Sequence, residues 1–207
     1  MARRENPLKG EREKQIKQAA LRLFSRRGFH HTTIADIAEE AGLGKGTIYW
    51  YWRSKEELAF ALVEDMLDAF LALIREEQGR EGPFHEKMRR LVDAAADLYA
   101  QEKEHCRLLW KFRADRHYIF NQEYVRAVTS YYQEMRTHLS AMVRRALEDG
   151  EIAGIDPDRA ALIILGITEG LELEWLENED FDLRESLHVV LENLFEGLRP
   201  GDRRGSG

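Results

Sequence analysis

Apolar residues recur three and four positions apart along most of the chain, which is the spacing of one face of an α-helix. In residues 11–27 this stripe consists of Ile16, Ala19, Ala20, Leu23 and Phe24, and Gly28 ends it. No segment alternates apolar and polar residues for long enough to predict a strand. The pattern therefore predicts an all-α protein of about nine helices.

Two short helices joined by a turn are predicted directly after the first helix. Thr33 and Asp36 fit a capping box that starts a helix at Thr33, and Gly42 follows its last apolar residue. Gly44 can cap a second helix that runs from Lys45 to about Tyr51. A helix, a short glycine-containing turn and another helix form the helix-turn-helix pattern, whose second helix enters the DNA major groove.

The faces of this second helix are predicted to have different roles. At about 100° per residue, Ile48 and Trp52 fall together and should point into a small core. Gly46, Thr47 and Trp50 lie on the opposite side and should face the groove. The helix therefore has one face for packing and another for DNA.

The residue types on the groove side suit nucleic acid. Lys45 can donate to guanine or to phosphate, and the Thr47 methyl can contact a thymine methyl. Gly46 has no side chain to keep the backbone away from DNA. The hydroxyls of Tyr49 and Tyr51 suit phosphate oxygens, although their rings are equally compatible with core packing.

The rest of the chain is predicted to form six further helices. These cover residues 54–78, 84–103, 105–113, 122–149, 156–178 and 182–198. We expect a DNA-binding domain in residues 1–53, with a flexible basic arm in residues 1–9. We further expect a helical ligand-binding and dimerisation domain in residues 54–198, and a disordered tail in residues 199–207.

Charge is divided unevenly along the 207 residues. The net charge is −7, but residues 1–58 hold 12 Lys and Arg against 8 Asp and Glu, so this part carries +4 and the remainder −11. A basic segment attached to an acidic one suits a protein that presents one surface to phosphates. Ordinary variation of a charged surface would give the same numbers, so charge alone does not decide the function.

The helix-turn-helix region resembles the DNA-binding region of the TetR family of transcriptional regulators. The matching residues are Thr33, Ile34, Ile37, Ala38, Ala41, Gly42, Leu43, Lys45, Gly46, Thr47, Ile48, Tyr49, Tyr51, Trp52, Ser54, Lys55, Glu56, Glu57 and Leu58. In detail the resemblance covers residues 11–62. The chain departs from the family at Gly44, where a Ser-like cap is usual, and at the bulky Trp50 and Trp52.

The resemblance implies a function and a set of DNA-binding residues. It implies DNA contacts by Thr33, Lys45, Gly46, Thr47, Tyr49, Trp50, Tyr51 and Lys55. It also implies a homodimer that binds a palindromic DNA operator and responds to a small-molecule effector. We therefore predict a cytoplasmic, ligand-responsive repressor. A transcriptional activator of the same fold is the alternative.

The later helices are predicted to serve dimerisation and sensing. The helix at 156–178 is apolar around most of its circumference, and Gly166 and Gly170 would allow close approach of either a second protomer or another helix of the same chain. Its Glu169, Glu172 and Glu174 are expected at the surface, and the alternative is that one of them pairs with a basic group on a ligand or on the helix at 122–149. The candidate contacts for a largely apolar ligand are Phe70, Trp110, Tyr131, Tyr132 and Trp175.

An enzyme and a helical adaptor are the competing classes. No catalytic set, metal-ligand cluster or phosphate-binding glycine loop stands out, so we expect no catalytic residues, no metal and no cofactor. An adaptor would use the helix-turn-helix to contact protein, but it has no need for Trp50 beside Gly46 on the groove side. No apolar run is long enough for a membrane span, and the single cysteine, Cys106, fits a reducing compartment.

Overall fold

The computed structural model describes residues 7–119 and 121–200, and within them the side chains of residues 9–114 and 121–200. The predicted arm residues Arg3 and Arg4, and the tail from residue 201 onward, lie outside the described residues. Over the described ranges every regular element is an α-helix, in agreement with the predicted fold class. The helices are α1 (Pro7–Arg27), α2 (Ile34–Glu40), α3 (Lys45–Tyr51), α4 (Lys55–Gly79), α5 (Phe84–Gln101), α6 (Lys103–Ile119), α7 (Gln122–Glu148), α8 (Pro157–Glu177) and α9 (Leu183–Glu196).

The chain divides into two compact units. Unit 1 comprises Met1–Met66 and Lys103–Arg126, and unit 2 comprises Leu67–Glu102 and Ala127–Gly207. Both α4 and α7 contain residues of the two units within one uninterrupted helix. Unit 1 is thus built from two segments that are distant in sequence.

In unit 1, α1 packs against α2 and α6, and α2 packs against α3. The fully buried side chains at the centre of this unit come from four of its helices, and they are Ile16, Phe24, Ile37, Ile48, Leu58 and Leu62. Three helices as short as α1–α3 bury too little surface to be stable separately, so this shared core is what holds α3 in place.

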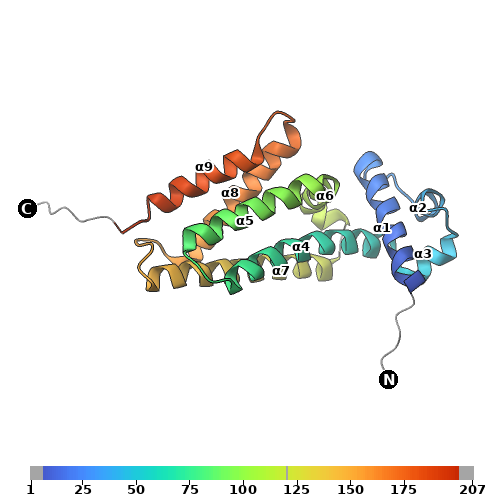
Figure 1. Ribbon diagram of the computed structural model, residues 1–207. Helices are drawn as coiled ribbons and strands as arrows, with labels where there is room; N and C mark the ends of the chain where they lie inside the picture. Colours follow the sequence, from blue (N-terminus) through green and yellow to red (C-terminus); the bar gives the residue numbers. More distant parts are fainter. Residues whose placement is uncertain (1–6, 120, 201–207) are drawn as a thin grey trace, which may run out of the picture. The chain divides into compact units, whose positions relative to one another are not determined.

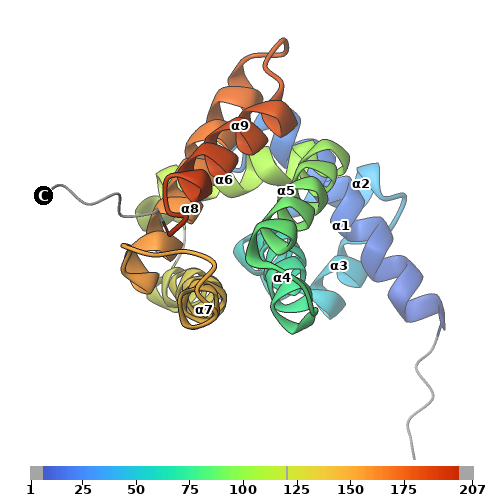
Figure 2. The same cartoon turned by 60° about the vertical axis from the view of Figure 1, so that its left-hand side comes forward.

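In unit 2, α9 packs against both α5 and α8, and α8 and α9 lie side by side in both views (Figures 1 and 2). Leu139, Val143 and Leu187 are among the buried side chains of this unit. The second half of α4 is tied to α7 by an ion pair between Arg75 and Glu134, and by a hydrogen bond of 2.9 Å from the Tyr131 hydroxyl to Asp68.

Local sequence explains most helix boundaries. The Thr33 hydroxyl accepts from the Asp36 N–H, and the Asp36 carboxylate accepts from the Thr33 N–H, which confirms the predicted capping box. Gly42 has a φ of +63°, the left-handed conformation expected after a helix, and the Leu43 N–H donates to the Ala38 carbonyl. Asp156 caps α8, with Pro157 at its first position.

Two predicted helices had wrong boundaries. Helix α1 begins at Pro7 instead of residue 11, because proline is well suited to the first turn of a helix, where its missing N–H has no bond to make. Helix α6 runs from Lys103 to Ile119 instead of 105–113, because no glycine or proline interrupts the chain there. Lys9 therefore lies in a helix and not in a flexible arm.

Candidate nucleic-acid interface

Helix α3 has one buried and one exposed face, as predicted. The Ile48 side chain is 0% exposed and that of Trp52, which follows the helix, is 6% exposed. Trp50 is 67% exposed and Tyr49 is 54% exposed. Two large aromatic side chains are costly to leave in water, so this surface is suited to contact with another molecule.

The surface beside Trp50 is open and basic. Lys45 and Gly46 are exposed, and Thr47 is half-buried. A Cβ atom added to Gly46 would have no other atom within 4 Å, so the fold of this chain leaves room for a side chain there. Packing within this chain therefore does not require a glycine at position 46.

The Lys55 side chain forms hydrogen bonds within unit 1. Its ammonium donates to the carbonyls of Phe29 and Thr32, each at 2.8 Å, and lies 4.1 Å from the centre of the Phe29 ring. Burial lowers the pKa of this ammonium below that of a free lysine. The structure thus shows Lys55 fastening the start of α4 to the loop between α1 and α2, with two of its three N–H groups already used.

Thr33 and Tyr51 also use their hydroxyl protons within the protein. The Thr33 hydroxyl donates to the Asp36 carboxylate at 2.6 Å, and its hydrogen bonds to Asp36 lower the pKa of that carboxyl group. The Tyr51 hydroxyl donates to the Lys9 carbonyl at 3.1 Å. Neither hydroxyl can donate to a phosphate without giving up these bonds.

The start of α4 is capped in a way that the sequence only partly indicated. The Ser54 hydroxyl accepts from the Glu57 N–H at 3.0 Å, as in a capping box. The Glu57 carboxylate, however, accepts from the N–H of Arg53 and so binds one residue further back. Two side chains at the start of α4, Ser54 and Glu57, therefore stabilise the bend between α3 and α4.

One residue predicted to lie in the flexible basic arm, Lys9, instead lies in a helix beside this surface. Lys9 is exposed, and its ammonium lies 5.4 Å from the centre of the Trp50 ring. The signal that could have revealed it is Pro7, since a helix starting there places Lys9 in the first turn of α1. Lys45, Gly46, Thr47, Tyr49, Trp50 and Lys9 together form a surface that we call the α3 face.

The five aromatic residues predicted to bind ligand do not all belong to one unit. Trp110 is in unit 1, where the Arg113 guanidinium lies 5.1 Å from the centre of its ring. Phe70 and Trp175 are in unit 2, and their ring centres lie 4.8 and 6.3 Å from that of Tyr99. The Tyr131 hydroxyl is bound to Asp68, and Tyr132 is half-buried.

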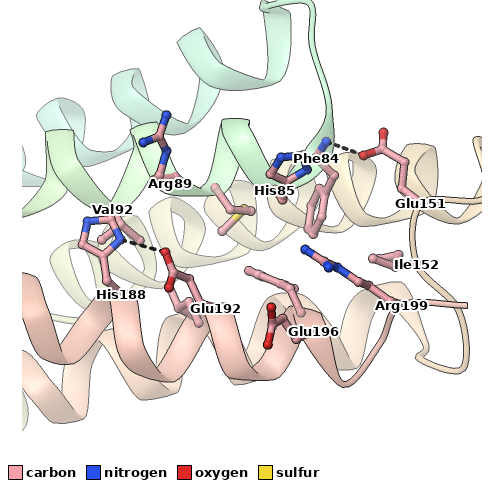
Figure 3. Close-up of a pocket in the computed structure, with 13 residues that line it drawn as sticks. Phe84, His85, Arg89, Val92, Glu151, Ile152, His188, Glu192, Glu196 and Arg199 are labelled. Carbon is pink, nitrogen blue, oxygen red and sulfur yellow. Dashed lines mark hydrogen bonds and ion pairs between the residues drawn. The ribbon is translucent and has the colours of Figure 1, made fainter. Parts of the chain in front are cut away.

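Unit 2 also contains a pocket of about 320 Å³ between α5 and α9 (Figure 3). Its inner surface is apolar and is formed by Phe84, Met88, Val92, Ile152, Leu191 and Phe195. Charged residues of both signs surround it, among them Arg89, Glu192, Glu196 and Arg199. None of the five predicted ligand-binding residues lines this pocket.

Polar contacts hold α9 against α5 next to this pocket. The Asp93 carboxylate accepts from Arg184 at 2.7 Å and lies 2.9 Å from His188 Nε2, and Asp97 also pairs with Arg184. The hydrogen bond with His188, and secondly the one with Arg184, lowers the pKa of Asp93. The Glu151 carboxylate accepts from the Phe84 N–H at 2.7 Å and so caps the start of α5 (Figure 3).

The carboxylates predicted at the surface of α8 differ in their burial. Glu174 is exposed, as predicted, but Glu172 is buried and Glu169 is half-buried. Among the described residues, no group of three or more His, Cys, Asp or Glu side chains is placed to hold a metal ion. No helix in the described ranges combines the length and apolarity needed to cross a membrane.

These features define a class of protein. A three-helix unit with a capped glycine turn presents an exposed, basic and aromatic α3 face, which is the arrangement of a helix-turn-helix DNA-binding unit. Residues 16–62 match the family model of bacterial regulatory proteins of the tetR family, and residues 84–198 match the C-terminal model of BetI-type transcriptional repressors. The chain belongs to the TetR family of transcriptional regulators.

Individual relatives agree with this assignment. The chain is 31% identical over 183 residues to the HTH-type transcriptional regulator TtgR of Pseudomonas putida, covering 85% of each chain. It is 24% identical over 186 residues to a fatty acid metabolism regulator protein of Bacillus subtilis, covering 89% of this chain and 94% of the relative. The crystal structure of the TetR family regulator PfmR from Thermus thermophilus has the same fold, with a TM-score of 0.76, 20% identity, and coverage of 89% of this chain and 98% of that one.

Proposed function

We propose that this protein is a homodimeric, ligand-responsive repressor that binds a palindromic DNA operator through the α3 face. The observation that carries the proposal is the position of the exposed large apolar side chains. Among the described residues they fall on only two surfaces: Tyr49 and Trp50 on α3, and Leu162, Ile163, Leu173 and Val189 on α8 and α9. One surface suits DNA and the other suits a second protomer.

Helix α8 supports the proposed dimer. Leu162, Ile163 and Leu173 lie on the same exposed stripe as Gly166 and Gly170. A Cβ atom at either glycine would meet no atom of this chain within 4 Å, which argues against close packing of the same chain at these positions. Small residues flanked by exposed apolar ones are suited to a close, two-fold symmetric helix contact.

A symmetric dimer determines the expected form of the operator. Two α3 helices related by a two-fold axis would enter successive major grooves about 34 Å apart, so each protomer would bind one half-site of a palindrome. We place Lys45, Gly46, Thr47 and Trp50 in the groove, and Tyr49 toward the phosphates. Lys55, Tyr51 and Thr33 would contribute mainly by holding the α3 face in position.

The proposed effector is a small, largely apolar molecule bound by the helices of residues 54–198. The aromatic group of Phe70, Tyr99 and Trp175 supports this class of ligand. A ligand that binds more tightly to a conformation with the wrong half-site spacing would release the DNA by shifting the population. Helix α4 is continuous and contains residues of both units. Its reorientation could therefore connect ligand binding to the release of DNA.

Two measurements test the proposal. The purified protein should select a palindromic duplex from a random pool and bind it, in a salt-dependent manner, at least about 1,000-fold more tightly than unrelated DNA. Native mass spectrometry of the protein as purified should show a dimer and any retained effector. Absence of any sequence preference would contradict the proposed repressor.

Comparing the binding of variants to the selected duplex and to unrelated DNA distinguishes sequence-specific contacts from general phosphate contacts. Lys45→Ala should reduce binding to the selected duplex more than to unrelated DNA, because it removes a groove contact. A joint change of Arg3 and Arg4 to alanine should weaken both equally, as expected for an arm that lies along phosphates. An arm that takes no part in binding would leave both affinities unchanged.

A further inference from the structure

The first turn of α1 is attached to the end of α3. The Tyr51 hydroxyl donates to the Lys9 carbonyl at 3.1 Å, and the Lys9 ammonium lies 5.4 Å from the centre of the Trp50 ring. Both contacts are within unit 1 and join residues about 40 positions apart in sequence. Lys9 thus lies beside the most exposed aromatic side chain of the α3 face.

The aromatic side chains at the end of α3 connect this contact to the core. The Trp50 and Tyr51 rings meet edge to face at 4.7 Å, and Tyr51 stacks on Trp52 at 5.5 Å. Trp52 is buried, so this series of rings runs from the core to the surface. The indole of Trp50 consequently has the Tyr51 ring on one side and the Lys9 ammonium close to its face, and both restrict its orientation.

Lys9 differs from Lys17 of the same helix in its available charge. Lys17 is paired with Asp65 at 2.8 Å, and Glu13 is 3.9 Å from the same ammonium. Lys9 has no carboxylate partner among the described residues, and its side chain is exposed. Its charge is therefore free to interact with a phosphate at the edge of the groove that Trp50 enters.

We propose that Lys9 is a further residue of the DNA interface: it holds the indole of Trp50 in its reading orientation and places a cation on the phosphate strand beside it. This inference rests on the proposed DNA-binding function and extends it from α3 to the start of α1. Lys9 then influences base preference through Trp50 and affinity through the phosphate.

The test uses the duplex that the wild-type protein selects from a random pool. Binding is measured over a range of salt concentrations for the wild type, Lys9→Ala and Lys14→Ala. Lys14 is an exposed lysine of the same helix with no described contact to α3, which makes it the matched control. Lys9→Ala should weaken binding about tenfold and reduce the slope of log K against log salt by about 1, whereas Lys14→Ala should change neither.

The positioning role has its own measurement. Repeating the selection with Lys9→Ala should relax the base preference at the positions that also relax in Trp50→Ala. The double variant should lose less affinity than the product of the two single losses, because each change removes part of the same contact. Independent losses that multiply, with base preference unchanged, would overturn the positioning role.

The outcomes distinguish this inference from the function on which it rests. If the wild type selects DNA but Lys9→Ala binds it with the same affinity and salt slope, the role of Lys9 is overturned and the repressor proposal stands. If the wild type selects no duplex at all, the repressor proposal fails and the inference fails with it. Matching thermal unfolding midpoints of the three proteins would show that any loss arises at the DNA surface.

Discussion

Two lysines in the helix-turn-helix region show that the same residue type serves different purposes. Lys45 is exposed on the α3 face, whereas the Lys55 ammonium is held by the carbonyls of Phe29 and Thr32. The TetR resemblance implies DNA contact for both. The structure gives them different surroundings, so a pair of identical substitutions can separate their roles.

Lys55→Met should destabilise the protein, because it leaves two carbonyl oxygens without their donor while keeping the length of the side chain. We expect a loss of about 1–2 kcal/mol in the free energy of unfolding. Lys45→Met should change stability by less than about 0.5 kcal/mol but weaken DNA binding by about 1–3 kcal/mol. Urea unfolding and DNA titration of both variants provide the measurements. An unchanged stability of Lys55→Met, with a reduced salt slope, would instead make Lys55 a phosphate contact.

Gly46 offers a test in which stability and binding change in opposite directions. Alanine there meets no atom within 4 Å and suits a helix better than glycine, so Gly46→Ala should stabilise the protein by about 0.5–1 kcal/mol. If the backbone approaches DNA closely at this position, the added methyl group should weaken binding by about 1–3 kcal/mol. Thermal unfolding and DNA titration would measure the two effects. Unchanged DNA affinity would place Gly46 away from the groove.

At the scale of the element, the helices were predictable where their ends are encoded locally. Thr33 and Asp36, Asp156 and Asp182 each cap a helix within three residues of themselves, and all three caps are present. Helix α6 was predicted too short, although no glycine or proline interrupts its sequence after Arg113.

The sequence predicted which side of α3 is buried and which is exposed, but it did not predict the hydrogen-bond partners of the site residues. Helical spacing correctly separated buried Ile48 and Trp52 from exposed Trp50. The partners of Lys55 and Tyr51 are 23 to 42 residues distant in sequence, and no local pattern indicates them. The DNA contacts themselves remain predictions.

The ionic contact between α5 and α9 should make stability depend on pH. Hydrogen bonds from His188 and Arg184 hold the pKa of Asp93 below its usual value of about 3.9. A lowered folded-state pKa contributes stability above the unfolded-state value, and this contribution is lost as the pH falls through the folded-state value. Asp93→Ala should therefore be less stable than the wild type at pH 6, and the difference should shrink toward pH 3.

Urea unfolding at pH 6, 4 and 3 would measure this difference. Asp93 is partly exposed, so solvent screening limits the effect to below about 1 kcal/mol. Glu185→Ala, at an exposed α9 residue outside this ion-pair group, is the control and should show no such trend. A difference that is constant with pH would indicate lost packing instead of lost charge.

At the scale of the whole molecule, the proposed dimer depends on the exposed apolar stripe of α8. Leu162→Glu places a charge where the proposed dimer needs an apolar contact. Leu162 is 57% exposed, so the folded monomer should tolerate the change within about 0.5 kcal/mol. Light scattering after gel filtration should show a monomer, and binding to the selected palindrome should fall sharply because the two half-sites are no longer read together.

The control for this variant is Ala72→Glu, an equivalent change at an exposed position of α4. It should leave both the mass in solution and the DNA affinity unchanged. A dimer that persists in Leu162→Glu would place the interface elsewhere.

The two-segment construction of unit 1 has a consequence for how the protein is made. Phe60 is buried, with the rings of Phe112 and Tyr124 at 6.2 and 4.5 Å, so part of this unit's core is supplied by residues 103–126. A nascent chain cannot complete the unit until those residues have left the ribosome. By the same reasoning, a chimaera that exchanges only the first 53 residues between two such regulators would combine α1 of one parent with α6 of the other. The surface between those two helices would then need to be matched before the hybrid could fold well.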